Sequence, residues 1–119
     1  MRYCWTTVLV KDLDESIAFY RDIVGLPVNR RFEADRGSEI AFLGSGETQV
    51  ELIQRKGPPA EPGDAVTLGF AVDSLDQTLA FIKEKGIAVE SGPFQPNEHI
   101  KFFYVLDPNG VKVQFSQSF

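Results

Sequence analysis

The chain has 119 residues, of which 43% are hydrophobic and 24% are charged. This length and composition are typical of one globular domain with a core of its own, and they exclude a largely disordered chain. No apolar run approaches the ~20 residues that a transmembrane helix needs. The 17 acidic and 12 basic residues give a net charge of −5, which argues against nucleic acid and membrane surfaces as partners. We therefore expect small molecules or other proteins as partners, with a mild bias toward neutral or cationic ligands.

The first half of the chain predicts one helix among four strands. Residues 3–10 are rich in β-branched and aromatic residues, which is typical of a strand. A helix begins near Asp14, with Asp12 or Asp14 as its N-cap, and ends at Gly25. Turn-forming residues then separate three extended segments, at about 26–33, 39–44 and 48–54.

The second half predicts the same order of elements. A strand at 66–72 is followed by a helix that begins at Ser74-Leu75-Asp76 and ends at Gly86. A strand starts at 87–89, and the last two strands are joined by a turn with the sequence Asp107-Pro108-Asn109-Gly110. These two strands span about 100–106 and 111–115.

The two halves align with each other, which indicates an internal repeat. Val10 to Asp14 lies over Val72 to Asp76, and Val50-Glu51-Leu52 lies over Val113-Gln114-Phe115. We expect a single α+β domain of two βαβββ repeats that form an open β cup with the helices outside. The repeats span about 1–57 and 65–119, and a Pro/Gly-rich linker at about 58–64 joins them.

Strand alternation separates an apolar face, which packs on the helices, from a mixed face that lines the cup. A concave sheet face of mixed polarity is a candidate binding site. The ligand-binding side chains that this alternation predicts are Trp5, Thr7, Glu51, Thr67 and Gln114. Cys4 falls on the helix-facing side of the first strand, and we expect it to be a buried small hydrophobe.

Two motifs resemble the vicinal oxygen chelate superfamily, which includes glyoxalase I, extradiol dioxygenases and bleomycin-binding proteins. The first runs from Val10 to Tyr20 and continues as Ile23-Val24-Gly25-Leu26, and the second is Phe102-Phe103-Tyr104-Val105-Leu106-Asp107-Pro108-Asn109-Gly110. The resemblance covers essentially the whole chain and implies the paired βαβββ fold. It does not select one reaction, because this fold hosts many.

The resemblance also implies where the metal ligands of metal-dependent members would fall. These positions carry Trp5, Glu51, Thr67 and Gln114, and only Glu51 is a residue typical of the family's ligands. A catalytic divalent ion normally needs about three protein donors. We therefore expect no metal and no other cofactor, while a divalent metal bound in an unfamiliar way stays open.

Three residues each allow a structural and a functional interpretation. Trp5, the single tryptophan, is either a core or dimer-interface aromatic or a stacking platform for a planar or cationic ligand. Glu51 is either a solvated carboxylate at the rim or a hydrogen-bond acceptor or general base. His99, the single histidine, is either an ordinary loop residue or an acid or base that reaches the ligand from the rim.

The resulting hypothesis is a cytoplasmic homodimer of the glyoxalase/bleomycin-resistance type that binds a small molecule without the family metal. Two alternatives remain open. One is a lyase or isomerase, such as a lactoylglutathione lyase, with Glu51 and His99 as catalytic residues. The other is a structural or regulatory dimer with a vestigial cup. The cytoplasmic location follows from the single cysteine and from an N-terminus that is typical of a strand, not of a signal peptide.

Overall fold

The computed structural model describes residues 4–58 and 66–119, which form two compact units divided between Glu61 and Pro62. The predicted linker at 58–64 lies, except for Pro58, outside the described residues, as does the first residue of the strand predicted at 3–10. None of the helices in the described ranges has the length and apolar character needed to cross a membrane.

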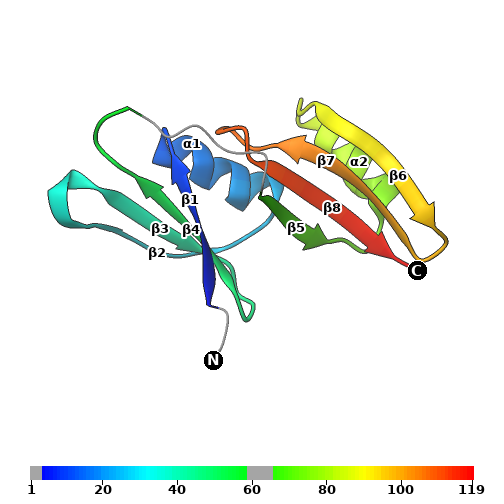
Figure 1. Cartoon of the computed structure of the whole chain (residues 1–119), viewed down its shortest axis with the longest axis horizontal. Helices are drawn as coiled ribbons and strands as arrows, with labels where there is room; N and C mark the ends of the chain where they lie inside the picture. The colour runs from blue at the N-terminus through cyan, green and yellow to red at the C-terminus, as the bar shows by residue number, and fades with distance from the viewer. Residues whose placement is uncertain (1–3, 59–65) are drawn as a thin grey trace. The chain divides into compact units, whose positions relative to one another are not determined.

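Unit 1 is a four-stranded mixed sheet with one helix (Figure 1). Its strand order is β1-β4-β3-β2, with β1 parallel to β4 and the other neighbours antiparallel. The elements in chain order are β1 (Trp5–Val10), α1 (Leu13–Ala18), a π-helical turn η1 (Phe19–Ile23), β2 (Val28–Glu33), a 3₁₀ turn η2 (Asp35–Gly37), β3 (Glu39–Leu43) and β4 (Gln49–Gln54).

Local chemistry explains where α1 begins and ends. Asp12 is the N-cap, and its carboxylate accepts a hydrogen bond from the Glu15 backbone N–H at 3.1 Å. At the other end Gly25 takes a φ of +88°, which glycine adopts without strain, and ends the helical segment as predicted. The choice that the sequence leaves open between Asp12 and Asp14 is thus resolved in favour of Asp12.

Asp14 instead joins the helix to the sheet. Arg31 on β2 donates to Asp14 at 2.6 Å and to Glu39 on β3 at 2.9 Å. The hydrogen bonds that Arg31 donates to Glu39 and Asp14 raise the pKa of its guanidinium above the ordinary value. These ion pairs are exposed, so their contribution to stability is small.

Unit 2 repeats the architecture of unit 1 (Figure 1). Its strand order is β5-β8-β7-β6, with β5 parallel to β8. The predicted α+β class and the βαβββ order of each repeat are confirmed, and both sheets are open. The elements are β5 (Thr67–Ala71), α2 (Leu75–Glu84), β6 (Val89–Asn97), β7 (Ile100–Leu106) and β8 (Lys112–Ser118).

Both helices begin in the same way. In unit 1 the Leu13 N–H donates to the side-chain oxygen of Gln54 at 2.6 Å, and in unit 2 the Leu75 N–H donates to that of Gln117 at 2.7 Å. Each glutamine lies at the end of the last strand of its unit and satisfies a helix-terminal N–H that has no partner within the helix. The internal repeat therefore extends to individual hydrogen bonds. Ser74 completes the parallel with Asp12, because it is the N-cap of α2.

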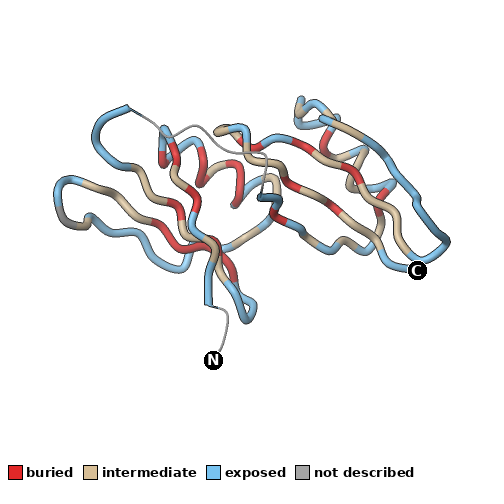
Figure 2. Tube along the Cα trace, in the orientation of Figure 1, coloured by how far each residue is buried: buried red, intermediate tan, exposed pale blue. Residues whose placement is uncertain are grey.

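The core of each unit lies between its helix and one face of its sheet (Figure 2). The strand residues on this face alternate with more exposed residues, as the sequence predicts. In unit 1 the buried apolar residues on this side are Val8, Val10, Leu13, Ile17, Phe19, Tyr20, Ala41, Leu43, Val50 and Leu52; in unit 2 they are Leu68, Leu75, Ile82, Phe103, Val105, Val113 and Phe115. Phe42 is also buried, but on the opposite face of the unit 1 sheet, where it pairs with Glu51. Cys4 does not follow its prediction: it precedes β1 and is exposed, so the pattern of the strand does not extend to it.

Candidate functional site

The face of the unit 1 sheet that points away from α1 brings three predicted site residues together. The parallel register pairs Thr7 of β1 with Glu51 of β4, and Trp5 with Gln49. The Thr7 hydroxyl donates to Oε1 of Glu51 at 2.6 Å. Within the described residues, this hydrogen bond holds one of the two carboxylate oxygens of Glu51. Thr7 thus orients the acid at the centre of this face.

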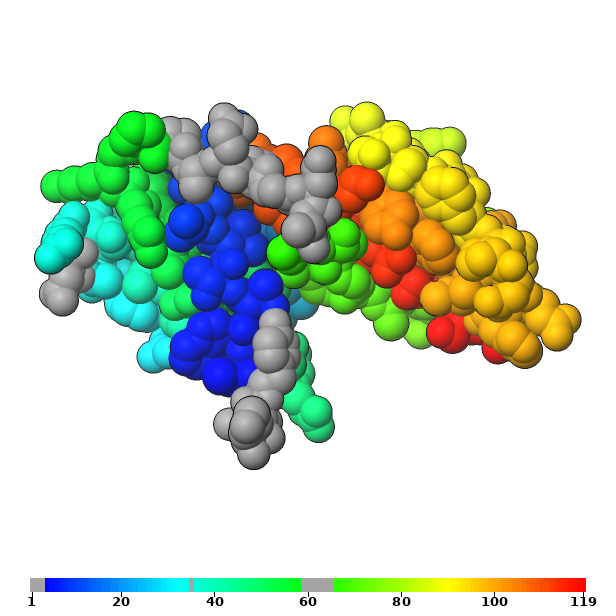
Figure 3. Space-filling model, in the orientation of Figure 1, coloured from blue at the N-terminus to red at the C-terminus, as the bar shows by residue number. Residues whose placement is uncertain are grey.

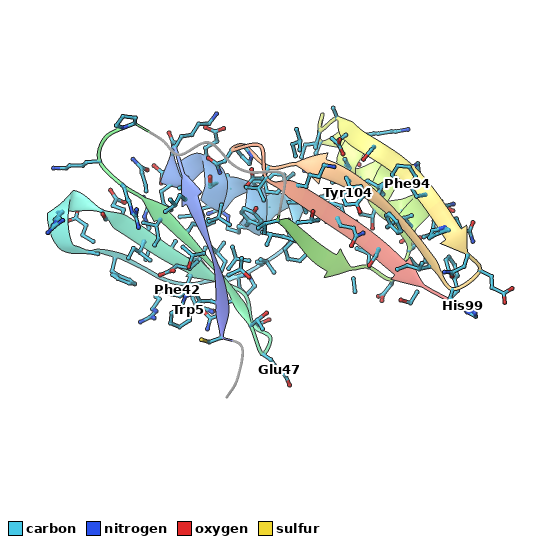
Figure 4. All side chains as sticks on the ribbon, viewed as in Figure 1. Trp5, Phe42, Glu47, Phe94, His99 and Tyr104 are labelled. Atoms are coloured by element: carbon cyan, nitrogen blue, oxygen red, sulfur yellow. The ribbon has the colours of Figure 1, made fainter. Side chains whose placement is uncertain are left out.

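An aromatic cluster lies beside this acid. The Trp5 and Phe42 rings meet edge to face with centroids 5.2 Å apart, and Phe32 lies parallel to Phe42 at 6.3 Å. The Arg30 guanidinium lies 4.5 Å above the centre of the Phe42 ring. Figure 4 shows Trp5 and Phe42 next to each other on unit 1. We call this surface the unit 1 open face; its residues are Trp5, Thr7, Glu51, Phe42, Phe32 and Arg30.

Phe42 and Trp5 differ in how much of each side chain is exposed to solvent. Phe42 is 3% exposed, because its neighbours and Arg30 cover it, whereas Trp5 is 44% exposed. The indole is therefore held from one side and free to meet a ligand from the other. A planar or cationic molecule can lie on that ring while a donor group reaches Glu51. Trp5 and Glu51 are about 7 Å apart along the strand direction, because Glu51 pairs with Thr7 and Trp5 lies two residues before Thr7.

The corresponding face of unit 2 is aromatic but carries no carboxylate at its centre. The side-chain N–H of Gln114 donates to the Tyr104 hydroxyl at 3.1 Å, and Phe94 and Phe102 lie within 5.7 Å of each other beside it. Thr67 is exposed on the same face, two residues before Gly69, which pairs with Gln114. The structure thus places Thr67 and Gln114 in one sheet, and Trp5, Thr7 and Glu51 in the other. A single cup that all five share remains a prediction.

The four positions that the resemblance assigns to metal ligands do not fit a divalent ion. The indole of Trp5 offers a donor N–H and no lone pair in its plane. Thr67 and Gln114 are neutral oxygen donors, which leaves Glu51 as the one carboxylate of the set. Across residues 4–58 and 66–119, no group of three or more His, Cys, Asp and Glu side chains is arranged to hold a metal.

His99 lies in the turn between β6 and β7 in unit 2 (Figure 4). Its side chain is 73% exposed, and its Nε2 lies 3.7 Å from a carboxylate oxygen of Glu98. Its backbone carbonyl accepts a hydrogen bond from Phe119, which joins the turn to the end of the chain. These contacts are those of an exposed turn residue, and a role for His99 as an acid or base remains a prediction.

Sequence reasoning missed the residues that build the platform under Trp5. Phe42, Phe32 and Arg30 belong to β3 and β2, and they face Glu51 and Trp5 because of the strand register. The alternation of Ile40 and Phe42 with Ala41 in the sequence indicates that Ile40 and Phe42 share one face of the sheet. The pairing of Phe42 with Glu51 depends on a register that periodicity does not supply.

Comparisons with known proteins agree with this architecture. A family model described as the Glyoxalase/Bleomycin resistance protein/Dioxygenase superfamily matches residues 2–115. A lactoylglutathione lyase of Haemophilus influenzae is 32% identical, in an alignment that covers 99% of this chain and 93% of that protein. The match therefore extends over both repeats.

Two solved structures share the fold at lower sequence identity. Glyoxalase I of Leishmania major superposes with a TM-score of 0.82 at 23% identity, over 97% of this chain and 85% of that one. TnmS3, an antibiotic binding protein from Streptomyces sp. CB03234, superposes with a TM-score of 0.82 at 21% identity, over 100% of this chain and 97% of that one. With two βαβββ units and a family match across nearly its whole length, the chain belongs to the glyoxalase/bleomycin resistance protein/dioxygenase superfamily.

Proposed function

We propose that the protein binds a small molecule on the unit 1 open face and does so without the family metal. The ligand stacks a planar or cationic group on Trp5 and donates a hydrogen bond to Glu51. The observation that carries this proposal is the Thr7–Glu51 hydrogen bond beside a half-exposed tryptophan. A carboxylate held in one orientation loses less entropy when a ligand binds than a freely rotating one. The antibiotic-binding protein TnmS3, which has the same fold, supports a binding role.

A lyase or isomerase is the second candidate, because the lactoylglutathione lyase of H. influenzae is similar over nearly the whole chain. In that function Glu51 would act as a general base that removes a proton next to a carbonyl group. Such a reaction also needs donors or a cation to stabilise the oxyanion that develops. On the unit 1 open face the Thr7 hydroxyl is already engaged with the carboxylate, which leaves the guanidinium of Arg30 as the cation for this role.

Two measurements on the purified protein separate these functions. Native mass spectrometry of the protein as isolated from cells detects a retained ligand, and its loss on unfolding gives the ligand's mass. A turnover assay with methylglyoxal and glutathione tests the lyase directly. We expect a bound small molecule, or quenching of Trp5 by a planar aromatic amine, together with no turnover. If the protein shows turnover that Glu51→Gln abolishes, the lyase replaces the binding function. If it shows neither a ligand nor turnover, the structural dimer is the function that remains.

The proposal includes a homodimer, because the sheets leave edges and apolar surface that association can cover. β1 and β2 are the edges of the unit 1 sheet, and β5 and β6 are those of the unit 2 sheet. Unpaired strand edges and exposed aromatic side chains are common sites of subunit contact. Large apolar side chains that are exposed in the described chain are Trp5, Val28, Phe32, Val66, Phe94, Leu106 and Phe119.

A further inference from the structure

Unit 1 contains an open pocket of about 560 Å³ where the turn after β2 meets the segment after β4. Arg36, Ser38, Arg55 and Lys56 line it. Figure 3 shows these two segments, cyan and green, side by side at one end of unit 1. None of these four residues belongs to the unit 1 open face as defined above.

Strand pairing brings the four residues together. Glu39 at the start of β3 pairs with Gln54 at the end of β4, so Ser38 and Arg55 flank the same end of an antiparallel pair. The Ala34 N–H donates to the Ser38 carbonyl at 2.8 Å and closes the turn that carries Arg36. Arg36 itself has a φ of +64°, an uncommon conformation for a residue with a side chain.

A glycine makes room for the lysine of the pocket. A Cβ atom at Gly37 would lie 2.3 Å from Cε and 2.8 Å from Nζ of Lys56. The absence of a side chain at Gly37 therefore allows the Lys56 ammonium group to lie over the turn. Gly37 also has a φ of +74°, so two separate features favour glycine at this position.

The charges in the pocket are unusual for this chain. Three cationic side chains lie together although the chain has a net charge of −5. Within the described residues none of the three forms an ion pair, whereas Arg31 on β2 has two carboxylate partners. Cations that lie close together repel one another, and an anion between them relieves this repulsion.

We propose that this pocket binds the carboxylate or phosphate group of a small molecule. The guanidinium groups of Arg36 and Arg55 supply paired N–H donors that match the oxygens of such a group. Lys56 adds a point charge, and the Ser38 hydroxyl can donate a further hydrogen bond. A volume of 560 Å³ is larger than one inorganic phosphate, so an organic acid or a phosphate ester fits as well. The proposal rests on other residues than the proposed function and does not require it.

The test measures the affinity of the full chain for inorganic phosphate, citrate and glycerol phosphate by isothermal titration calorimetry, at constant ionic strength set with chloride. The double substitution Arg55→Gln/Lys56→Gln removes two charges from the pocket. Lys83→Gln/Lys85→Gln removes two exposed charges from the end of α2 and is the matched control. Far-ultraviolet circular dichroism and thermal unfolding verify that all variants fold.

We expect at least one of the three anions to bind and the pocket variant to bind it at least tenfold more weakly. The control should change the affinity less than twofold. Amide NMR shifts on titration should be largest at residues 36–38 and 55–57. Absence of binding by all three anions, or an equal loss in the control, would overturn the proposal, because the second result is the signature of unspecific charge. The ratio of phosphate to citrate affinity distinguishes a phosphate site from a carboxylate site.

Discussion

The Thr7 hydroxyl donates to Oε1 of Glu51 at 2.6 Å across the parallel pair of β1 and β4. The corresponding pair in unit 2 is Gly69 and Gln114, which has neither a hydroxyl nor a carboxylate. There the Gln114 side chain donates to the hydroxyl of Tyr104. Tyr104 pairs with Gln114 as Phe42 pairs with Glu51, so these two aromatic residues occupy equivalent positions. The two repeats therefore share their backbone and differ at their polar centres: unit 1 has an oriented acid and unit 2 a neutral amide.

Replacement of Thr7 by valine tests whether this hydrogen bond supports ligand binding. The substitution keeps the shape of the side chain and removes the donor, so Glu51 is no longer held in one orientation. A hydrogen bond to a charged group contributes about 1.5–3 kcal/mol where it is well shielded, and less at an exposed site such as this one. We expect Thr7→Val to weaken ligand binding about fivefold and Thr7→Ser to retain most of the affinity. Equal losses in both variants would show that the methyl group, and not the hydroxyl, is needed.

Metal content tests the proposed absence of the family metal. Because Trp5, Thr67 and Gln114 stand at three of the four family positions, we expect elemental analysis of the purified protein to find far less than one divalent ion per chain. Added Zn²⁺, Ni²⁺ or Mn²⁺ should leave the melting temperature unchanged, since no ion binds the folded state. Retention of about one ion per chain, lost in Glu51→Ala, would contradict this.

The matched glutamines Gln54 and Gln117 give a stability prediction for both units. Each accepts a hydrogen bond from the first N–H of a helix, and its loss leaves that part-buried donor unsatisfied. Gln54→Ala and Gln117→Ala should each lower the free energy of unfolding by about 1–2 kcal/mol. Gln77→Ala on the exposed surface of α2 is the control, with an expected change within about 0.5 kcal/mol. Urea denaturation measures all three, and a loss in Gln54→Ala no larger than in the control would refute the capping role.

The predicted dimer is tested by size-exclusion chromatography with light scattering. We expect twice the mass of the chain at micromolar concentration, because open sheets with exposed aromatic residues favour association. Phe32→Glu and Phe94→Glu place a charge on each of two exposed aromatic positions, so the variant that dissociates identifies the sheet at the interface. A monomeric parent protein would remove the dimer from the proposal and, with it, any site shared between subunits.

Local signals predicted most of the fold. The caps at Asp12 and Ser74, the glycines that end the helices and the period-two alternation of the strands each act over a few residues, so they can be read from the chain. They were sufficient to place Thr7 and Glu51 on one face. β8 ends later than predicted, at Ser118, because polar residues at its end continue the pairing with β7.

The features that sequence reasoning missed depend on contacts between distant residues. The stack of Phe32, Phe42 and Arg30 needs the register of three strands, and the pocket between Arg36 and Arg55 needs the end of a hairpin to meet the end of another strand. Cys4 was wrongly predicted to be buried because it precedes β1, so the alternation of the strand does not extend to it.

The central claim, that Trp5 and Glu51 bind the same ligand, is tested most directly by the fluorescence of Trp5, the single tryptophan of the chain. The parent protein and Glu51→Gln are titrated with the molecule recovered by native mass spectrometry, or with the planar aromatic amine that quenches the parent most strongly. The substitution keeps the shape of the side chain and removes its charge, which should weaken a charge-assisted hydrogen bond by about 1–3 kcal/mol. We predict quenching that saturates in the parent and an affinity at least tenfold lower in Glu51→Gln. An unchanged affinity in Glu51→Gln, or a bound ligand that leaves Trp5 fluorescence unaltered, would contradict the assignment of the site.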